Sequence, residues 1–85
     1  MPKMKNTRKN LQKINHVPCA YSHYDKKGIR IRIGSTRDCK ARLTGHFGKI
    51  KAKYFSKKET RTASEARSIE KSICERENPR LNSRC

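Results

Sequence analysis

The sequence has few of the residues from which large hydrophobic cores are built. Its 85 residues include no tryptophan, and apolar and aromatic residues make up 32% and 6% of the chain. A chain of this length and composition is expected to form one domain with a thin core. It also has no apolar run long enough for a membrane helix and no signal-peptide pattern. We therefore expect neither a membrane protein nor a secreted one.

Acidic residues are also scarce. Seven Asp and Glu residues stand against 23 Lys and Arg residues, which gives a net charge of +16 at neutral pH. A solubilising surface rarely needs so large an imbalance, whereas a nucleic acid releases counterions wherever a cation contacts a phosphate. We therefore expect a nucleic-acid partner in preference to an anionic membrane.

The cysteines lack the spacing of zinc ligands. No C-x-x-C pair occurs, and His16-x-x-Cys19 is the one tight ligand-like spacing, which argues against a zinc site. Without a signal peptide we expect a cytoplasmic protein with reduced thiols, in which Cys39 and Cys74 are small core residues. The four cysteines are Cys19, Cys39, Cys74 and Cys85.

The residue patterns divide the chain into a basic arm at 1–16 and an α/β domain of the α+β type at 17–85. The arm contains five Lys or Arg residues and no acid, which predicts a flexible segment. In the rest of the chain, β-branched runs, turn residues and helical periodicity predict an antiparallel sheet with helices. The expected elements are strands at 17–24 and 29–35, a helix at 38–47, a strand at 51–56 and a helix at 62–77.

The second expected strand carries two arginines. Ile29, Ile31 and Ile33 alternate with Arg30 and Arg32. Because alternate side chains of a strand point to opposite faces, we expect the isoleucines to pack on the core side. Arg32 would project on the other face, and Arg30 would contact a second phosphate or lie in solvent.

The helix at 62–77 carries a carboxylate on its apolar side. The sequence Thr62-Ala-Ser-Glu65 is a capping box that begins this helix. Glu70 lies within the apolar arc, where a carboxylate must be paired, protonated or bound to a metal. An ion pair with an arginine and a functional role both remain open. The apolar arc consists of Ala63, Ala66, Ile69, Ile73 and Cys74.

The helix at 38–47 places two functional side chains beside its apolar stripe. Arg42 and His46 are four residues apart and therefore lie on one face. A solvated helix edge would explain them, but together with Glu70 they suggest a cationic pocket that holds one carboxylate. Phosphodiester cleavage needs such a set: a phosphate clamp, a ligand for a hard metal and a base. The stripe consists of Cys39, Leu43 and Phe47.

Taken in order, these residues resemble the skeleton of the GIY-YIG nuclease domain family. Cys19-Ala20-Tyr21 matches the first short motif and keeps its tyrosine. Arg32-Ile33-Gly34 matches the second motif, with an arginine in place of the tyrosine. The resemblance covers residues 17–82. The rest of the match, at consistent spacings, consists of Arg42, His46, Glu70 and Asn82.

The resemblance implies a fold and an activity. The fold would be a three-stranded antiparallel sheet flanked by helices. The activity would be that of a small metal-dependent endonuclease that hydrolyses phosphodiester bonds with low sequence specificity, with DNA favoured over RNA and Mg²⁺ or Mn²⁺ as cofactor. A double-strand cut by so small a site would favour a homodimer.

The resemblance also implies roles for the matching residues. Glu70 would hold the metal ion, and Arg42 would bind the scissile phosphate in a bidentate manner through two guanidinium nitrogens. Tyr21 would deprotonate the attacking water, assisted by the neighbouring cation of Arg32. His46 would position Tyr21 or the water, or relay the proton. Asn82 would brace the pocket on the side of Glu70. Basic residues expected to contact nucleic acid are Arg30, Arg37, Lys40, Lys49, Lys51 and Lys53.

Two other functions remain open at this point. The loss of the second tyrosine to Arg32, together with the high charge, favours a nucleic-acid-binding protein that has a nuclease fold and no longer cuts. A basic inhibitor or assembly partner that recognises an acidic protein surface is the third alternative.

Overall fold

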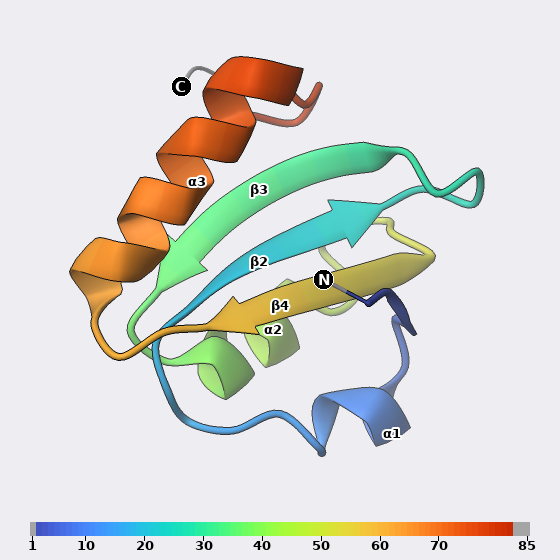
Figure 1. The fold of residues 1–85 in the computed structure, drawn as a ribbon. Helices are drawn as coiled ribbons and strands as arrows, with labels where there is room; N and C mark the ends of the chain where they lie inside the picture. The colour runs from blue at the N-terminus through green and yellow to red at the C-terminus, as the bar shows by residue number, and fades with distance from the viewer. Residues whose placement is uncertain (1, 83–85) are drawn as a thin grey trace.

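The computed structural model describes residues 2–82, which form one antiparallel sheet with helices on both faces (Figure 1). The strands follow the order β1-β4-β2-β3, so that β3 is an edge strand. The elements are β1 (Met4–Lys5), α1 (Arg8–Leu11), β2 (Cys19–Tyr24), β3 (Arg30–Thr36), α2 (Cys39–His46), β4 (Tyr54–Glu59) and α3 (Ala63–Glu77). The predicted α+β class is confirmed, and the sheet has four strands where three were expected. Among residues 2–82, none of the helices is both long and apolar enough to cross a membrane.

The hairpin of β2 and β3 brings the two short motifs together. The Asp25 carboxylate accepts hydrogen bonds from the backbone N–H groups of Lys27 and Ile29, each at 2.9 Å, and so closes the turn. Because β3 begins only after this turn, Ile29 is 59% exposed and does not pack on the core as expected. The pairing places Tyr21 opposite Gly34.

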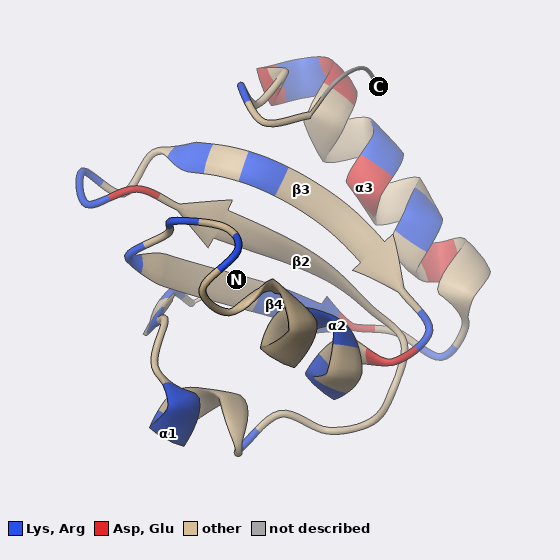
Figure 2. Ribbon diagram, turned by 180° about the vertical axis from the view of Figure 1, so that it is seen from behind, with Lys and Arg blue, Asp and Glu red and all other residues tan. Residues whose placement is uncertain are grey.

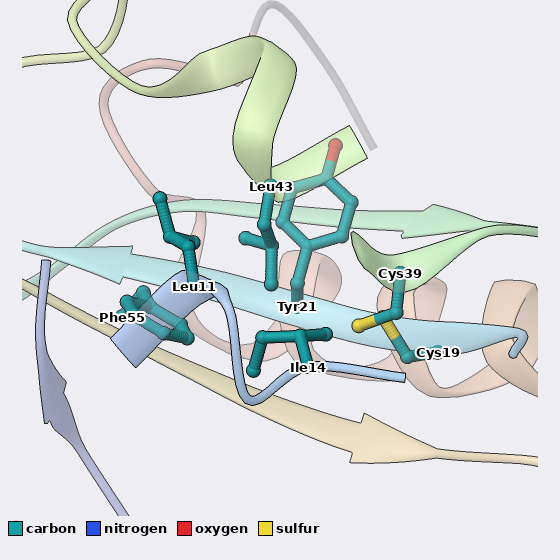
Figure 3. Close-up of a cluster of buried hydrophobic side chains, with 7 residues drawn as sticks. All are labelled: Leu11, Ile14, Cys19, Tyr21, Cys39, Leu43 and Phe55. Atoms are coloured by element: carbon teal, nitrogen blue, oxygen red, sulfur yellow. A yellow bond between two sulfur atoms is a disulfide. The ribbon is translucent and has the colours of Figure 1, made fainter. Parts of the chain in front are cut away.

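The two faces of the sheet pack against different helices. One face is covered by α3, whose predicted apolar arc is confirmed by the burial of Ala66, Ile73 and Cys74. The other face packs against α1, the segment after it and α2 (Figure 3). The larger cluster, on this second face, consists of Leu11, Ile14, Cys19, Tyr21, Cys39, Leu43 and Phe55.

The N-terminal segment belongs to the domain, contrary to the expected flexible arm at 1–16. Within the described part of that segment, β1 pairs with β4 through Met4 opposite Phe55. Leu11 and Ile14 are only 4% and 3% exposed. These two aliphatic side chains cover the sheet face opposite α3, and their burial provides a reason for the segment to order.

A disulfide joins Cys19 of β2 to Cys39 of α2, with the two Cα atoms 5.5 Å apart. The structure differs here from the expectation of reduced thiols. The bond ties the strand that carries Tyr21 to the helix that carries Arg42. Cys74 is buried as expected but is disulfide-bonded where a reduced thiol was expected, and Cys85 lies outside the described residues.

Candidate active site

The site is built around the outer edge of β3, where the two faces of the sheet meet. The chain after α3 runs along this edge, and its backbone N–H at Leu81 donates to Ile31 O at 2.9 Å. The side-chain amide of Asn82 pairs with both backbone groups of Ile33, at 3.0 and 2.9 Å. Asn82 therefore holds the edge strand directly, and its bracing of the pocket near Glu70 stays a prediction.

Tyr21 reaches this edge because β3 has no side chain in its path. A Cβ atom at Gly34 would lie 2.4 Å from the Tyr21 hydroxyl oxygen and 2.5 Å from Cζ. The tyrosine ring therefore lies directly over the glycine backbone. Figure 3 shows the hydroxyl directed away from the other side chains of the core cluster. The glycine of the second motif is thus required by the tyrosine of the first.

Glu70 approaches the same edge from the α3 face. It is half-buried, and Ser35, the residue after Gly34, donates a hydrogen bond from Oγ to Glu70 Oε1 at 2.6 Å. Among the described residues Glu70 forms no ion pair. The arginine pair that the sequence left open is therefore absent, and the carboxylate retains acceptor capacity.

The oxygen ligands available at Glu70 fit a hard divalent cation. Carboxylate and hydroxyl oxygens are the ligands that Mg²⁺ prefers, and Mg²⁺ keeps most of its coordination for water and substrate oxygens. Within residues 2–82 no cluster of three or more His, Cys, Asp or Glu side chains could hold a metal ion. A site with one carboxylate suits Mg²⁺ better than zinc, which takes three or four protein ligands.

A basic cavity of about 750 Å³ opens beside this edge, between the end of β3, α2 and the start of α3. The acidic residue that lines this cavity is Asp38, the N-cap residue of α2. The backbone N–H of Ala41, and next the imidazole of His16, hold the pKa of the Asp38 carboxyl below its usual value. The cavity is therefore strongly cationic and suits a phosphate. Its cations are Arg37, Arg42, Lys49 and Arg67.

Three aromatic rings meet behind the cavity. Ring centroids lie 5.8 Å apart for Tyr21 and His23, 5.5 Å for Tyr21 and His46, and 5.7 Å for His23 and His46. The Nδ1 atoms of both histidines, and Nε of Arg32, are buried without a hydrogen-bond partner among the described residues. Sequence reasoning missed His23. The available signal was its position two residues after Tyr21, which puts it on the same face of β2.

Burial and nearby cations keep both histidines neutral. Burial above all, and then the charges of His46 and Arg32, lower the pKa of His23 to about 4. Burial also lowers the pKa of His46, with contributions from Arg32, Arg42 and Lys49. Each neutral imidazole has one nitrogen that can accept a proton.

We expect this burial to make the protein acid-sensitive. The pKa of His23 is about 4 in the folded chain against 6.5 when unfolded. The unfolded chain therefore binds more protons between these values, and the free energy of unfolding falls by about 3 kcal/mol as the pH drops from 6.5 to 4. Urea unfolding at several pH values measures this slope. His23→Phe should flatten it, and Lys71→Ala, at an exposed position of α3, should not; equal slopes in all three proteins would contradict the assignment.

The remaining predicted cations are divided between this region and others. Arg30 lies on the α3 face, where it pairs with Glu77 and donates to Ser22 Oγ at 2.9 Å and Tyr24 Oη at 3.1 Å. It is therefore not available for the expected phosphate contact. The Lys40 ammonium donates to Gln12 O, and Lys53 does not line the cavity. Figure 2 shows basic residues without acids on α1, α2 and β3, and mixed charge on α3.

Comparisons with known proteins identify solved structures that have a similar fold. No family model matches the chain, and no curated protein sequence matches it. The solved structures that it resembles include the GIY-YIG N-terminal endonuclease domain of UvrC from Thermotoga maritima bound to magnesium, with a TM-score of 0.77 and 21% identity over 88% of this chain and 93% of that one. A tyrosine-to-phenylalanine point mutant of that domain gives a TM-score of 0.79 at 21% identity, over 91% of this chain and 94% of that one. The chain therefore has the fold of a GIY-YIG endonuclease domain.

Proposed function

We propose that this protein is a small metal-dependent endonuclease that hydrolyses phosphodiester bonds inside the cell, with DNA favoured over RNA and low sequence specificity. The observation that carries the proposal is that Tyr21 lies over Gly34 and Glu70 is bonded to the next residue, Ser35, which lines a cavity with four cations. The similar UvrC domain is described as an endonuclease domain bound to its catalytic magnesium, which supports the same chemistry here.

Glu70 would hold Mg²⁺ or Mn²⁺ through its carboxylate, which retains acceptor capacity beside the Ser35 hydrogen bond. When bound, the metal ion would neutralise charge that develops on the phosphate and its leaving oxygen. The Ser35 hydroxyl keeps the carboxylate oriented by its 2.6 Å hydrogen bond. Since the described residues offer Glu70 as one such ligand per chain, a double-strand cut needs two chains or two successive binding events.

The protein side chains would position the phosphate and move the proton. Arg42 is exposed in the cavity and can bind two oxygens of the scissile phosphate. The Tyr21 oxygen would accept a proton from the attacking water while its own proton passes to a neutral imidazole. His46 suits this role because its ring packs 5.5 Å from that of Tyr21 and its buried Nδ1 has no partner among the described residues. The water oxygen bonds to phosphorus as the phosphorus–oxygen ester bond breaks.

A second candidate function is binding without cleavage. Arg32 stands where the second motif would carry its tyrosine, and its Nε is buried without a partner among residues 2–82. A cation at this place can contact phosphate whether or not the bond is cut. The high net charge of +16 supports binding in either case.

Cleavage assays distinguish the two candidates. Supercoiled plasmid and single-stranded substrates are incubated with Mg²⁺, with Mn²⁺ or with EDTA. We expect nicking with either metal and none in EDTA, and Arg42→Ala should slow nicking about 100-fold or more through loss of charge stabilisation. Lys71→Ala, at an exposed position of α3, is the matched control. Tight binding without nicking under any of these conditions would overturn the endonuclease proposal in favour of the binding protein.

A further inference from the structure

A second basic groove lies on the other side of the catalytic residues. It has a volume of about 490 Å³ and is bounded by the outer edge of β3, the loop after α2 and the chain after α3. Four of its lining side chains are cations, two are aliphatic and none is acidic. These residues are Arg32, Lys49, Ile50, Lys51, Arg80 and Leu81.

Backbone hydrogen bonds hold both walls of this groove. On one side, Leu81 N–H donates to Ile31 O at 2.9 Å, and the buried Pro79 precedes the wall residues. On the other side, the N–H groups of Lys49 and Ile50 both donate to His46 O at 3.0 Å. The groove is thus formed in advance of binding, which reduces the entropy lost when a ligand orders it.

The groove is continuous with the active site through two residues. Lys49 lines both this groove and the larger cavity that contains Arg42. Arg32 lines the groove, and its charge acts on His23 and His46 behind the active site. A polyanion bound at the scissile position would therefore extend into the groove without leaving cationic surface.

The aliphatic side chains distinguish this groove from a site that binds phosphate groups alone. Leu81 is 42% exposed, and it is one of only two large hydrophobic side chains exposed among residues 2–82. Together with the half-buried Ile50 it offers an apolar wall between cations. A paired base is stacked between its neighbours in the duplex, whereas an unpaired base is free to pack its face against apolar side chains such as these.

Resting on the endonuclease function proposed above, we propose that the groove binds the single strand of nucleic acid next to the scissile phosphate. Lys51 and Arg80 contact the backbone phosphates of this strand, and Ile50 and Leu81 contact an unpaired base. The substrate class is therefore nucleic acid with unpaired nucleotides beside the cut, such as a flap, a bulge or a free single strand.

Binding measurements on the full chain in EDTA test the groove independently of cleavage. Fluorescence anisotropy compares a blunt duplex with the same duplex that carries a short single-stranded flap. Leu81→Ser should weaken binding of the flap substrate about five- to tenfold through lost apolar contact and leave the blunt duplex unchanged. Arg80→Ala should reduce the slope of log affinity against log salt by about 0.7 for the flap substrate, the value for one phosphate contact on a single strand.

Matched variants control for surface and charge effects. Ile29→Ala removes the other exposed large aliphatic side chain, and Lys71→Ala removes a cation of α3; neither residue lines the groove. Both should bind the two substrates like the parent. The proposal that the groove binds a single strand would be overturned if Leu81→Ser and Arg80→Ala affected the flap substrate and the blunt duplex equally, or affected neither. A chain that binds flaps through the groove but never cuts supports the proposed single-strand site and contradicts the proposed endonuclease activity. A chain that cuts but binds flaps independently of the groove supports the endonuclease activity and contradicts the single-strand site.

Discussion

Glu70→Gln is expected to abolish metal-dependent cleavage, a loss of more than about 1,000-fold, because the metal ion contributes several kcal/mol of charge stabilisation. Stability should change by less than about 1 kcal/mol, since the new amide oxygen can still accept the Ser35 hydrogen bond. The substituted carboxylate also forms no ion pair among the described residues, so no partner cation is left unpaired. Plasmid nicking in Mg²⁺ and thermal unfolding measure the two effects.

The control for this variant is Glu75→Gln, at an exposed position of the same helix. It removes the same charge from α3 but lies outside the cavity at the edge of β3. Its cleavage rate should match that of the parent. If Glu70→Gln instead lowers the melting temperature strongly and still cuts, Glu70 has a structural role and is not a metal ligand.

Gly34→Ala is expected to cost both stability and activity. The added Cβ would lie 2.4 Å from the Tyr21 hydroxyl oxygen, which is far closer than a non-bonded contact allows. Tyr21 is 1% exposed and belongs to the packed core cluster, so the ring cannot move away freely. Overpacking of this kind costs about 1–3 kcal/mol of unfolding free energy. Displacement of the hydroxyl by about 1 Å should also slow cleavage about 100-fold.

Gly45→Ala is the matched control for stability. Gly45 lies in α2, and a Cβ there meets no atom within 4 Å beyond its chain neighbours and the backbone of its own helix. The substitution should therefore raise the free energy of unfolding by about 0.5–1 kcal/mol, because alanine favours the helix. Urea unfolding of both variants separates a general effect of glycine replacement from the contact with Tyr21. A Gly34→Ala protein as stable as the parent, with full cleavage, would contradict the position of the Tyr21 ring.

Much of the fold could be predicted because it depends on local patterns. The period of 3.6 in α3 predicted its buried arc, and the half-burial of Glu70 follows from the same wheel. The capping residues Asp38 and Thr62 begin their helices as their side-chain hydrogen bonds require. Alternation in β3 correctly put Arg32 on the face of Tyr21 and His23.

Strand alternation and composition failed as guides where other contacts compete with them. Ile29 continues the alternation, but the Asp25 turn takes its backbone N–H and leaves its side chain in solvent. The segment at 1–16 has the composition of a flexible arm, yet Leu11 and Ile14 find a sheet face to cover. The turn at Asp25 is a local contact, whereas the burial of Leu11 and Ile14 depends on a sheet face formed by residues far away in the sequence.

The residue types of the site can be read from the chain: one inward carboxylate, an arginine and histidine four residues apart, and a tyrosine on a basic hairpin. Their assembly cannot, because it depends on contacts between residues far apart in sequence. The Ser35–Glu70 hydrogen bond spans 35 positions, and the pairing of Asn82 with Ile33 spans 49. The Asn82 contact exists because β3 is an edge strand whose outer backbone groups are free to pair, and the Ser35 contact exists because α3 packs against β3. Periodicity determines the face on which a side chain lies, whereas strand order and packing determine which faces come together.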